Sequence, residues 1–289
     1  MAILSIQSHV AYGHVGNAVV VFLLQRLGFE VWPVMTVQFS NHAGYESCRG
    51  RAFSAEELRE VVRGIGERGV LADCRAVLSG YLGDPAVGAV VLEALAAVRA
   101  ANPEALFCCD PVMGDQGRGL YVRAGLPDFF CDRAVPAADI LTPNLFELAE
   151  LSGRPIESLE DALAAARGLL QRGSQPGPRV LLVTSLRHPE SAYDEIGMLA
   201  VTGDAAYRVA TPRLPLDPAP NGAGDSVAAL FLGHLLQGCS VEDALANAAA
   251  GIFAILSETG IAESRELQIV AAQEALLKPE VTFGVERIG

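Results

Sequence analysis

The sequence has no positively charged tract and an excess of acidic residues. Its 289 residues include 21 Lys and Arg against 34 Asp and Glu, which gives a net charge of −13. Because nucleic acids and anionic membranes are bound through a positive footprint, this composition argues against both as partners. Any phosphate group that the protein binds must be held by backbone amides, a metal ion or a few placed cations.

Signal, membrane and disulfide patterns are missing as well. No basic region precedes an apolar run at the N-terminus, so no secretory signal peptide is predicted. The purest apolar stretch near the C-terminus, residues 245–256, is shorter than the ~20 residues that span a bilayer. The six cysteines are scattered without a CxxC pair, which disfavours a zinc ribbon or a small disulfide scaffold. We therefore expect a cytoplasmic protein with reduced thiols.

Apolar runs of strand length alternate with segments of helical period along most of the chain. Such alternation predicts an α/β fold with a mostly parallel central sheet and helices on both faces, and we expect residues 1–289 to form one domain. The predicted strands cover residues 2–6, 29–38, 76–79, 106–109, 140–142 and 180–184. The predicted helices between them cover residues 15–28, 54–68, 85–101, 144–151 and 158–172.

The last third of the chain has a different pattern. Residues 198–202 and 207–210 are predicted to form a hairpin, which would give the sheet a small antiparallel edge. Helices are expected over residues 221–237, 241–257 and 265–277, and the Pro-rich run 213–220 suggests a mobile segment. Since ligands of open α/β sheets bind at the carboxyl ends of the strands, polar residues just after strands are the candidates for a site.

The sharpest motif, Asn-Gly-Ala-Gly-Asp-Ser at residues 221–226, precedes an apolar helix. Gly222, Ala223 and Gly224 would leave free amides at the helix N-terminus, where an anion binds. Asp225 would repel that anion, unless it accepts a proton from a hydroxyl group that attacks a phosphoryl group. The alternative is that Asp225 only caps the helix, which is worth about 1 kcal/mol. The motif by itself leaves both readings open.

Two familiar phosphate-binding motifs are absent. The sequence contains no GxxxxGK[ST], which excludes a P-loop enzyme. The glycines of residues 222–224 do not continue to GxGxxG and follow a Pro-rich loop, so a dinucleotide-binding dehydrogenase is disfavoured.

Acidic and amide side chains follow two further strands. Asp110 comes directly after strand 106–109, and Asn144 and Glu147 follow strand 140–142. Asn144 and Glu147 have the spacing of a helix capping pair, which is the structural reading of these two residues. Together with Asp110 they could also share a Mg²⁺ ion, directly or through its waters, and so neutralise phosphate oxygens.

Aromatic and polar side chains gather after the first strands. Ser8 and His42, with the aromatic faces of Phe39, Tyr45 and Tyr81, could hold a flat ring with polar edges. Their spacing predicts an aromatic pocket that faces the phosphate-handling helix, but it does not identify the ring.

Seven segments of the sequence carry a resemblance to known proteins: residues 8–17 (SHVAYGHVGN), 32–42 (WPVMTVQFSNH), 78–83 (LSGYLG), 109–114 (CDPVMG), 142–147 (TPNLFE), 222–225 (GAGD) and the tail 266–273. Together they resemble one enzyme family, the bacterial pyridoxal kinases of the ribokinase superfamily. The Gly-x-Gly-Asp element at residues 222–225 is typical of the whole superfamily, whereas the first two segments are specific to vitamin B6 kinases. The resemblance covers essentially the whole chain.

The resemblance implies a ribokinase-like domain that transfers a phosphoryl group from ATP to the 5′-hydroxymethyl group of pyridoxal. Asp225 would be the general base, and the amides of Gly222, Ala223 and Gly224 would hold the transferring group. The residues implied in the pyridoxal site are Ser8, Val37, Phe39, His42, Ala43, Gly44, Tyr81 and Asp225.

For ATP, the resemblance implies a site with a lid and a metal ion. Asp110 and Glu147 would hold Mg²⁺, and the loop 114–121 would close over the phosphates to exclude water. Kinases of this family are often stimulated by K⁺ and form cytoplasmic homodimers. The residues implied at ATP are Asp110, Tyr121, Thr142, Asn144, Glu147, Thr184, Arg213, Leu214, Pro215 and Leu216.

The sequence departs from the family pattern at two positions. Ala43 stands where the family commonly has Thr, and Thr184 stands where several bacterial members have Lys. The alternatives to a pyridoxal kinase are a hydroxymethylpyrimidine kinase and a non-catalytic vitamin B6-binding protein on the same fold. The motifs at residues 8–17 and 32–42 argue against the first, and the presence of Asp225, Asp110 and Glu147 argues against the second.

Overall fold

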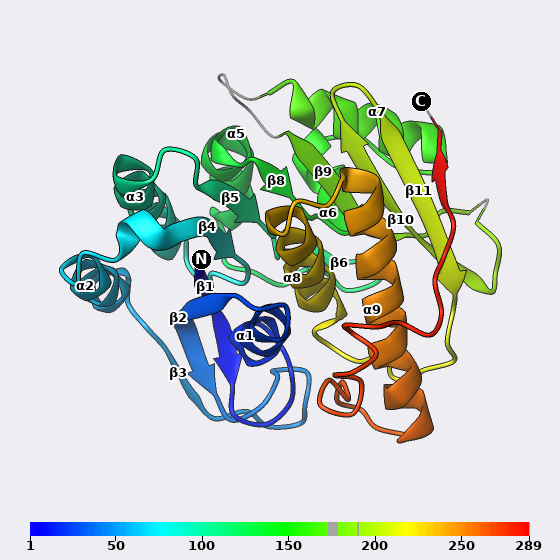
Figure 1. Cartoon of the computed structure of the whole chain (residues 1–289), viewed down its shortest axis with the longest axis horizontal. Coiled ribbons are helices and arrows are strands. Elements are labelled where there is room, and N and C mark those ends of the chain that lie inside the picture. Colours follow the sequence, from blue (N-terminus) through cyan, green and yellow to red (C-terminus); the bar gives the residue numbers. More distant parts are fainter. Residues whose placement is uncertain (173–178, 190, 289) are drawn as a thin grey trace.

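A ten-stranded sheet forms the centre of the computed structural model, which describes residues 1–172, 179–189 and 191–288 (Figure 1). The strands lie in the order β12-β11-β10-β9-β8-β5-β4-β1-β2-β3. Their bounds are β1 Ala2–Val10, β2 Glu30–Phe39, β3 Gly50–Ala52, β4 Cys74–Ser79, β5 Leu106–Cys109, β8 Ile140–Leu141, β9 Val180–Leu186, β10 Glu195–Thr202, β11 Ala206–Pro212 and β12 Val285–Arg287.

The middle of the sheet is parallel, as predicted. Strands β2, β1, β4, β5, β8 and β9 run in the same direction, so their carboxyl ends meet at one edge. The predicted hairpin is strands β10 and β11, and β12 extends it in antiparallel fashion. At the other side β3 pairs antiparallel with β2, so antiparallel strands lie at both sides of the sheet, where only one was predicted.

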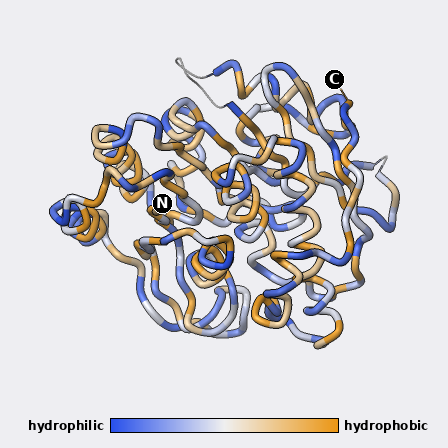
Figure 2. The backbone as a smooth tube through the Cα atoms, viewed as in Figure 1, coloured by the Kyte–Doolittle hydropathy of each residue, from blue (hydrophilic) through white to orange (hydrophobic). Residues whose placement is uncertain are grey.

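Helices cover both faces, which confirms the predicted α/β class. In Figure 1, α1 (Asn17–Arg26), α8 (Ala223–Leu236) and α9 (Val241–Ile261) lie in front of the sheet. Apolar residues run along the strands and the central helices (Figure 2). The capping box predicted at Ser54 begins helix α2 (Ala55–Gly66), and both of its hydrogen bonds are formed. The opposite face carries α2 (Ala55–Gly66), α3 (Pro85–Ala101), α4 (Leu126–Phe129), α5 (Val135–Ala137), α6 (Leu145–Ser152) and α7 (Leu159–Leu170), with short turns at Leu71–Asp73 and Phe130–Ala134.

The predicted helix over residues 265–277 is wrong. This segment is a series of turns, in which bonds of helical spacing such as Ala272 N–H to the Gln268 carbonyl (3.1 Å) are not consecutive. The amide of Gln268 donates to Thr259 Oγ1 at the end of α9 instead. Leu267 and Leu276 are nevertheless buried, beside Gly222 at the start of α8 and Gly251 of α9, so the apolar spacing reflects packing against these helices.

Helix α9 is longer than predicted and has the length and hydropathy of a membrane span. It contacts α8 and strand β11, and half of its apolar window is buried inside the molecule. We therefore interpret α9 as a core helix. Residues 213–220 form neither helix nor strand, as expected, while their mobility stays a prediction.

Candidate active site

Asp225 lies in the first turn of α8, at the carboxyl edge of the sheet. No side chain caps this helix, because Gly222 occupies the N-cap position with φ 92°. The Asp225 carboxylate accepts a hydrogen bond from the Gly16 amide instead (2.8 Å), so the capping alternative is wrong. Withdrawal from solvent raises the pKa of Asp225, and the Gly16 hydrogen bond opposes that shift. The first amides of α8 are therefore free beside a carboxylate that is held by another segment.

Only glycine fits at Gly222 and Gly16, which bring this helix close to the first strand. A Cβ atom on Gly222 would lie 2.0 Å from the His14 carbonyl oxygen. A Cβ atom on Gly16, where φ is 54°, would lie 2.4 Å from Ser8 Oγ. Ser8 thus lies next to the residue whose amide holds Asp225.

Ser8 lies within β1, not after it as the sequence suggested. The pairing of β1 with β2 shifts register between Gln7 and His9, so Ser8 is at an irregularity of the sheet. Such irregularities change the direction of a side chain and are frequent next to active sites. Among the described residues, Ser8 Oγ makes no hydrogen bond and is available to a ligand.

Asp110 and Glu147 form a buried acidic centre beyond the ends of β5 and β8. Their exposed fractions are 5% and 3%. Burial, then the charges of Glu147 and Asp225, raise the pKa of Asp110 well above its usual range. Burial also raises the pKa of Glu147 to about 8, against the hydrogen bonds that it accepts. When ionised, the carboxyl groups of Glu147 and Asp225 therefore repel that of Asp110, and each group holds its proton more tightly than an exposed carboxyl does.

Glu147 and Asn144 form the predicted capping box of α6, and they also fix the loop after β5. Glu147 accepts from the amides of Asn144 (2.9 Å) and Met113 (3.0 Å). Asn144 Nδ2 donates to the Gly114 carbonyl (2.9 Å). The structural reading of this pair is confirmed, and the same contacts set the path of the loop that follows Asp110.

The loop predicted as a lid is a small antiparallel ribbon made of β6 (Gly114–Asp115) and β7 (Gly119–Leu120). Tyr121 follows it, half exposed, with its amide bonded to the Met113 carbonyl (3.1 Å). Partial burial and the nearby Glu147 and Asp110 raise the pKa of Tyr121, which places the ring beside the acidic centre.

Two threonines flank the same centre. Thr142 follows β8, and its buried Oγ1 lies at the Asp110 carboxyl, whose pKa it lowers against the effect of burial. Thr184 lies inside β9, and its amide donates to the Pro143 carbonyl (3.0 Å), which places it beside the residue that follows Thr142. The Thr142 hydroxyl therefore belongs to the acidic centre.

Residues Arg213, Leu214, Pro215 and Leu216 lie between β11 and α8. The Arg213 amide bonds to the Asp194 carbonyl (2.7 Å), and Leu216 lies beside Gly260 of α9. Among the described residues, no hydrogen bond or ion pair joins this segment to the acidic centre. Its predicted place near ATP stays a prediction.

The aromatic side of the site is built from β2 and the segment after β4. Val37 is buried at 3% exposure, and its side chain and the Tyr81 ring both lie beside Gly83. Thr36 Oγ1 donates to the Tyr81 carbonyl (2.7 Å), which holds the two segments together. Phe39, half-buried, ends β2 on the same side.

His42 lies in the loop after β2, next to Ala43 and Gly44. Its Nδ1 accepts a hydrogen bond from the Gly44 amide (3.1 Å). Burial, followed by the charge of Arg118 in the lid ribbon, lowers the pKa of His42, which favours a neutral ring. Since Nδ1 accepts, the ring proton of the neutral form is on Nε2, which is then a donor.

Sequence reasoning missed Arg265 and Glu266, which touch this loop. Tyr45 donates its hydroxyl to Glu266 Oε1 (2.5 Å), and Arg265 donates to the Gly44 carbonyl (2.8 Å). The two partners are 221 residues away in the chain, so no local pattern could reveal the contact. The only sequence feature that pointed to this region was the resemblance of the tail 266–273 to the family, and it did not indicate a contact with the His42 loop.

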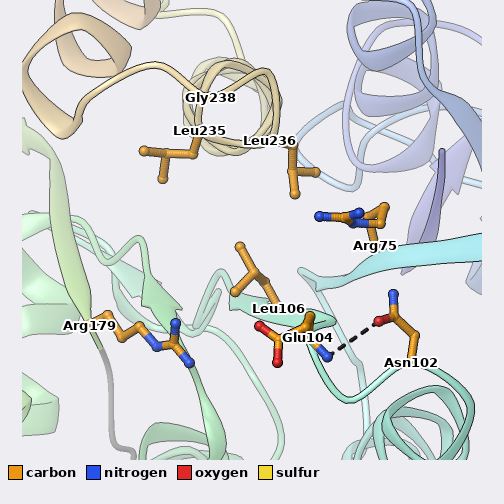
Figure 3. Close-up of a pocket in the computed structure, with 8 residues that line it drawn as sticks. All are labelled: Arg75, Asn102, Glu104, Leu106, Arg179, Leu235, Leu236 and Gly238. Atoms are coloured by element: carbon orange, nitrogen blue, oxygen red, sulfur yellow. Dashed lines mark hydrogen bonds between the residues drawn. The ribbon is translucent and has the colours of Figure 1, made fainter.

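A separate depression opens at the other end of the sheet (Figure 3). Arg75 and Arg179 flank it, with Leu235 and Leu236 of α8 on one side and Leu106 on the other. It lies at the amino ends of β4, β5 and β9, and none of the predicted site residues lines it. The candidate active site is therefore the carboxyl edge described above.

Comparisons with known proteins agree on one family of kinases for this chain. The phosphomethylpyrimidine kinase family matches residues 59–265. The chain is 56% identical over 287 residues to "Pyridoxal kinase PdxY" of Rubrobacter xylanophilus, covering 99% of this chain and 97% of that protein. It is 51% identical to the protein of the same name from Deinococcus radiodurans, covering 99% of this chain and 96% of that protein.

Solved structures agree with these sequence relatives. The pyridoxal kinase of Leishmania donovani, in complex with ADP and pyridoxamine, superimposes with a TM-score of 0.91 at 28% identity, covering 100% of this chain and 99% of that chain. A putative phosphomethylpyrimidine kinase from Bacteroides thetaiotaomicron gives a TM-score of 0.88 at 26% identity, covering 99% and 97%. With full-length relatives above 50% identity, this chain belongs to the pyridoxal kinases, within the wider phosphomethylpyrimidine kinase family.

Proposed function

We propose that this chain transfers the terminal phosphoryl group of ATP to the 5′-hydroxyl group of pyridoxal, and that residues 1–289 act as one kinase domain. The observation that carries the proposal is the placement of Asp225. It lies among the free amides at the start of α8, is held by the Gly16 amide, and has Ser8 as a near neighbour. A protein that only bound the vitamer would need no carboxylate beside an anion-binding helix end.

Asp225 acts as the general base. Gly16 occupies one of its carboxylate oxygens, which leaves the other to accept the proton of the 5′-hydroxyl. Its raised pKa makes it a better proton acceptor than an exposed aspartate. The amides of Gly222, Ala223 and Gly224 then bind the charge on the group in transfer, as helix N-termini bind phosphate.

The ring of the substrate lies between the first strands. Ser8 donates to or accepts from the ring edge, while Val37, Phe39 and Tyr81 supply apolar contacts to its faces. His42 offers Nε2–H as a donor to a ring substituent. Ala43 and Gly44 add backbone but no hydroxyl, so the selection of one vitamer rests on Ser8 and His42.

The acidic centre suits a Mg²⁺ ion that arrives with the nucleotide. Within the part of the chain that the structure describes, no three His, Cys, Asp or Glu side chains converge to hold a metal by themselves. Asp110 and Glu147 are nevertheless buried, mutually repulsive carboxyl groups, and Mg²⁺ usually takes one or two carboxylates together with phosphate oxygens and waters. When bound, the ion neutralises charge on the phosphate oxygens.

The remaining nucleotide contacts are proposed from the resemblance to the family. Thr142 and Thr184 offer hydroxyl groups to the phosphates, and Asn144 orients Glu147. Tyr121 and the β6–β7 ribbon close over the reacting group, because transfer to an alcohol must exclude water. The segment of Arg213, Leu214, Pro215 and Leu216 borders the base of ATP.

The second candidate is phosphorylation of a hydroxymethylpyrimidine. The family match over residues 59–265 and the likeness to the Bacteroides protein favour it. Both reactions use an aromatic ring that bears a hydroxymethyl group, so the same base and helix amides would serve.

A substrate panel separates the two candidates. Purified protein is incubated with Mg²⁺–ATP and, in separate reactions, with pyridoxal, pyridoxine, pyridoxamine or hydroxymethylpyrimidine, and the products are read by mass spectrometry. We expect phosphorylated pyridoxal. Phosphorylation of the pyrimidine alone would replace the proposal by the second candidate, and pyridoxal binding without product would leave a non-catalytic binding protein.

The resemblance extends to the setting of the enzyme. We expect a cytoplasmic homodimer, stimulated by K⁺, and all six cysteines lack disulfide partners, as in a reducing compartment. Light scattering of the purified protein, together with rates in K⁺ and Na⁺ buffers, tests the two other expectations.

A further inference from the structure

The loop that carries His42 is closed by Asn41, whose Nδ2 donates to the carbonyls of His42 (3.1 Å) and Ser47 (2.8 Å), but these bonds hold the backbone and not the His42 ring. Gly44 donates its amide to His42 Nδ1, and Tyr45 donates its amide to the His42 carbonyl (3.2 Å). The orientation of the His42 ring therefore depends on where Gly44 and Tyr45 are fixed.

The segment after α9 fixes both of these residues. Arg265 donates to the Gly44 carbonyl (2.8 Å), and its guanidinium lies 3.8 Å from the centre of the Tyr45 ring. Glu266 accepts the Tyr45 hydroxyl (2.5 Å). Figure 1 shows the loop after β2 and the turns after α9 side by side at the lower edge of the molecule.

Glu266 is itself anchored from several sides. It is only 8% exposed, and its Oε2 accepts the amide of His14 (3.3 Å). A Cβ atom on Gly13 would lie 2.1 Å from that oxygen, so a glycine makes room for the carboxylate. Ser264 closes a turn with the Glu266 backbone through two hydrogen bonds. The anchor joins the loop after β1, the loop after β2 and the C-terminal segment.

We propose that Arg265 and Glu266 are positioning residues that hold His42 against the substrate ring. They do so through Gly44 and Tyr45 and do not touch the substrate themselves. The inference rests on the proposed function in that the ring held there is pyridoxal. The C-terminal segment is thus part of the substrate site, although it lies outside the motifs at the strand ends.

The test uses variants at Tyr45 and Arg265, where side chains are accessible enough to replace without loss of folding. Tyr45→Phe removes the hydrogen bond to Glu266, and Arg265→Met removes the hold on Gly44. Matched controls are Tyr12→Phe, an exposed tyrosine in edge contact with Tyr45, and Arg26→Met, which breaks a remote pair with Glu274. Glu266→Gln completes the set.

For each protein, the pyridoxal KM, the ATP KM, kcat and the dissociation constant of pyridoxal are measured. We expect Tyr45→Phe, Arg265→Met and Glu266→Gln to raise the pyridoxal KM and dissociation constant about three- to twentyfold, the loss of one or two hydrogen bonds. The ATP KM and kcat should stay within about twofold of wild type, and the controls should match wild type.

The decisive step repeats Tyr45→Phe and Arg265→Met in a His42→Ala background. If the clamp acts through His42, its loss has little further effect there, and the double-mutant cycle is strongly non-additive. Equal fold-changes in both backgrounds would overturn the proposal, as would variants that behave like the controls. A wild type that neither binds nor phosphorylates pyridoxal would instead overturn the proposed function.

Discussion

Two buried aspartates at opposite ends of the β5–β8 pair have opposite environments. Asp139 directly precedes β8, and Asp110 directly follows β5. They are almost equally buried, at 3% and 5% exposure. One lies at the amino edge of the sheet and the other at the carboxyl edge, so the comparison isolates what differs between the two edges.

Asp139 is fully provided with partners. Its Oδ2 accepts from Arg99 (2.7 Å) and from the Phe107 amide (2.7 Å), and Arg179 lies 3.5 Å from Oδ1. A buried carboxylate with cations and an amide around it is a structural feature that joins β5 to β8.

Asp110 has no ion pair among the described residues, and its charged neighbours are Glu147 and Asp225. Burying like charges together is unfavourable unless a cation compensates them. The contrast teaches that Asp139 at the amino edge stabilises the fold, whereas the buried carboxyl groups at the carboxyl edge lower the stability of the ligand-free protein and require a bound cation to compensate them.

The largest expected effect is on turnover. Asp225→Asn should lower kcat by about 10²–10⁴, because the base is lost, while pyridoxal binding changes little. Steady-state kinetics with a separate binding measurement checks this. Turnover close to wild type in this variant would remove Asp225 from the role of base.

Replacing each of the two aspartates by asparagine should change the free energy of unfolding in opposite directions. Asp139→Asn should lower the free energy of unfolding by about 2–3 kcal/mol, because Arg99 and the Phe107 amide lose charge-assisted partners. Asp110→Asn should raise it in the ligand-free protein, on the order of 1 kcal/mol, because a repulsive buried charge is removed. Urea unfolding at pH 8 measures both, and a loss of stability in Asp110→Asn would contradict the comparison.

The stability of the ligand-free protein should fall as the pH rises. The pKa values of Asp110, Glu147 and Asp225 are raised by folding, so the folded state binds more protons than the unfolded state. Their contribution is fully present below the unfolded pKa values, 3.8 for the aspartates and 4.5 for Glu147, and the share of Glu147 is lost towards pH 8, where Glu147 ionises. Tm is measured between pH 5 and pH 8.5 for wild type and Asp110→Asn. A wild-type Tm that does not change with pH, and that is equally flat in Asp110→Asn, would show that the carboxyl groups of the centre do not repel one another.

The smallest effect concerns the substrate ring. Ser8→Ala should raise the pyridoxal KM about threefold to tenfold, the loss of one neutral hydrogen bond, with kcat almost unchanged. The ATP KM of the same variant is the internal control. An unchanged pyridoxal KM would remove Ser8 from the pocket.

The sequence predicted the parts that local patterns determine. Strand-length apolar runs located the parallel strands, and polar residues after them located Asp110, Asn144 and Glu147, because carboxyl ends of parallel strands share one edge. The short strands β3 and β12 were missed, since each has three residues and is defined by its pairing with another strand rather than by its own sequence.

The partners of the site residues could not be predicted in the same way. Gly16 belongs to a recognised motif, but its hydrogen bond to Asp225 spans 209 residues. Glu266 meets Tyr45 across 221 residues, and its segment was expected to be a helix. Apolar spacing indicated that this segment packs on the core but could not show that its polar residues reach the substrate loop.

The most direct test of the acidic centre is ligand-induced stabilisation at pH 8. Tm is measured for wild type, Asp110→Asn and Asp139→Asn, each without ligand, with Mg²⁺ alone, with ADP alone and with both. We predict that wild type and Asp139→Asn need both ligands for full stabilisation, which reaches about 2.7 kcal/mol at 100 times the dissociation constant. Asp110→Asn should lose the part that depends on Mg²⁺. An equal Mg²⁺-dependent rise in Asp110→Asn would contradict the assignment of this centre as the cation site.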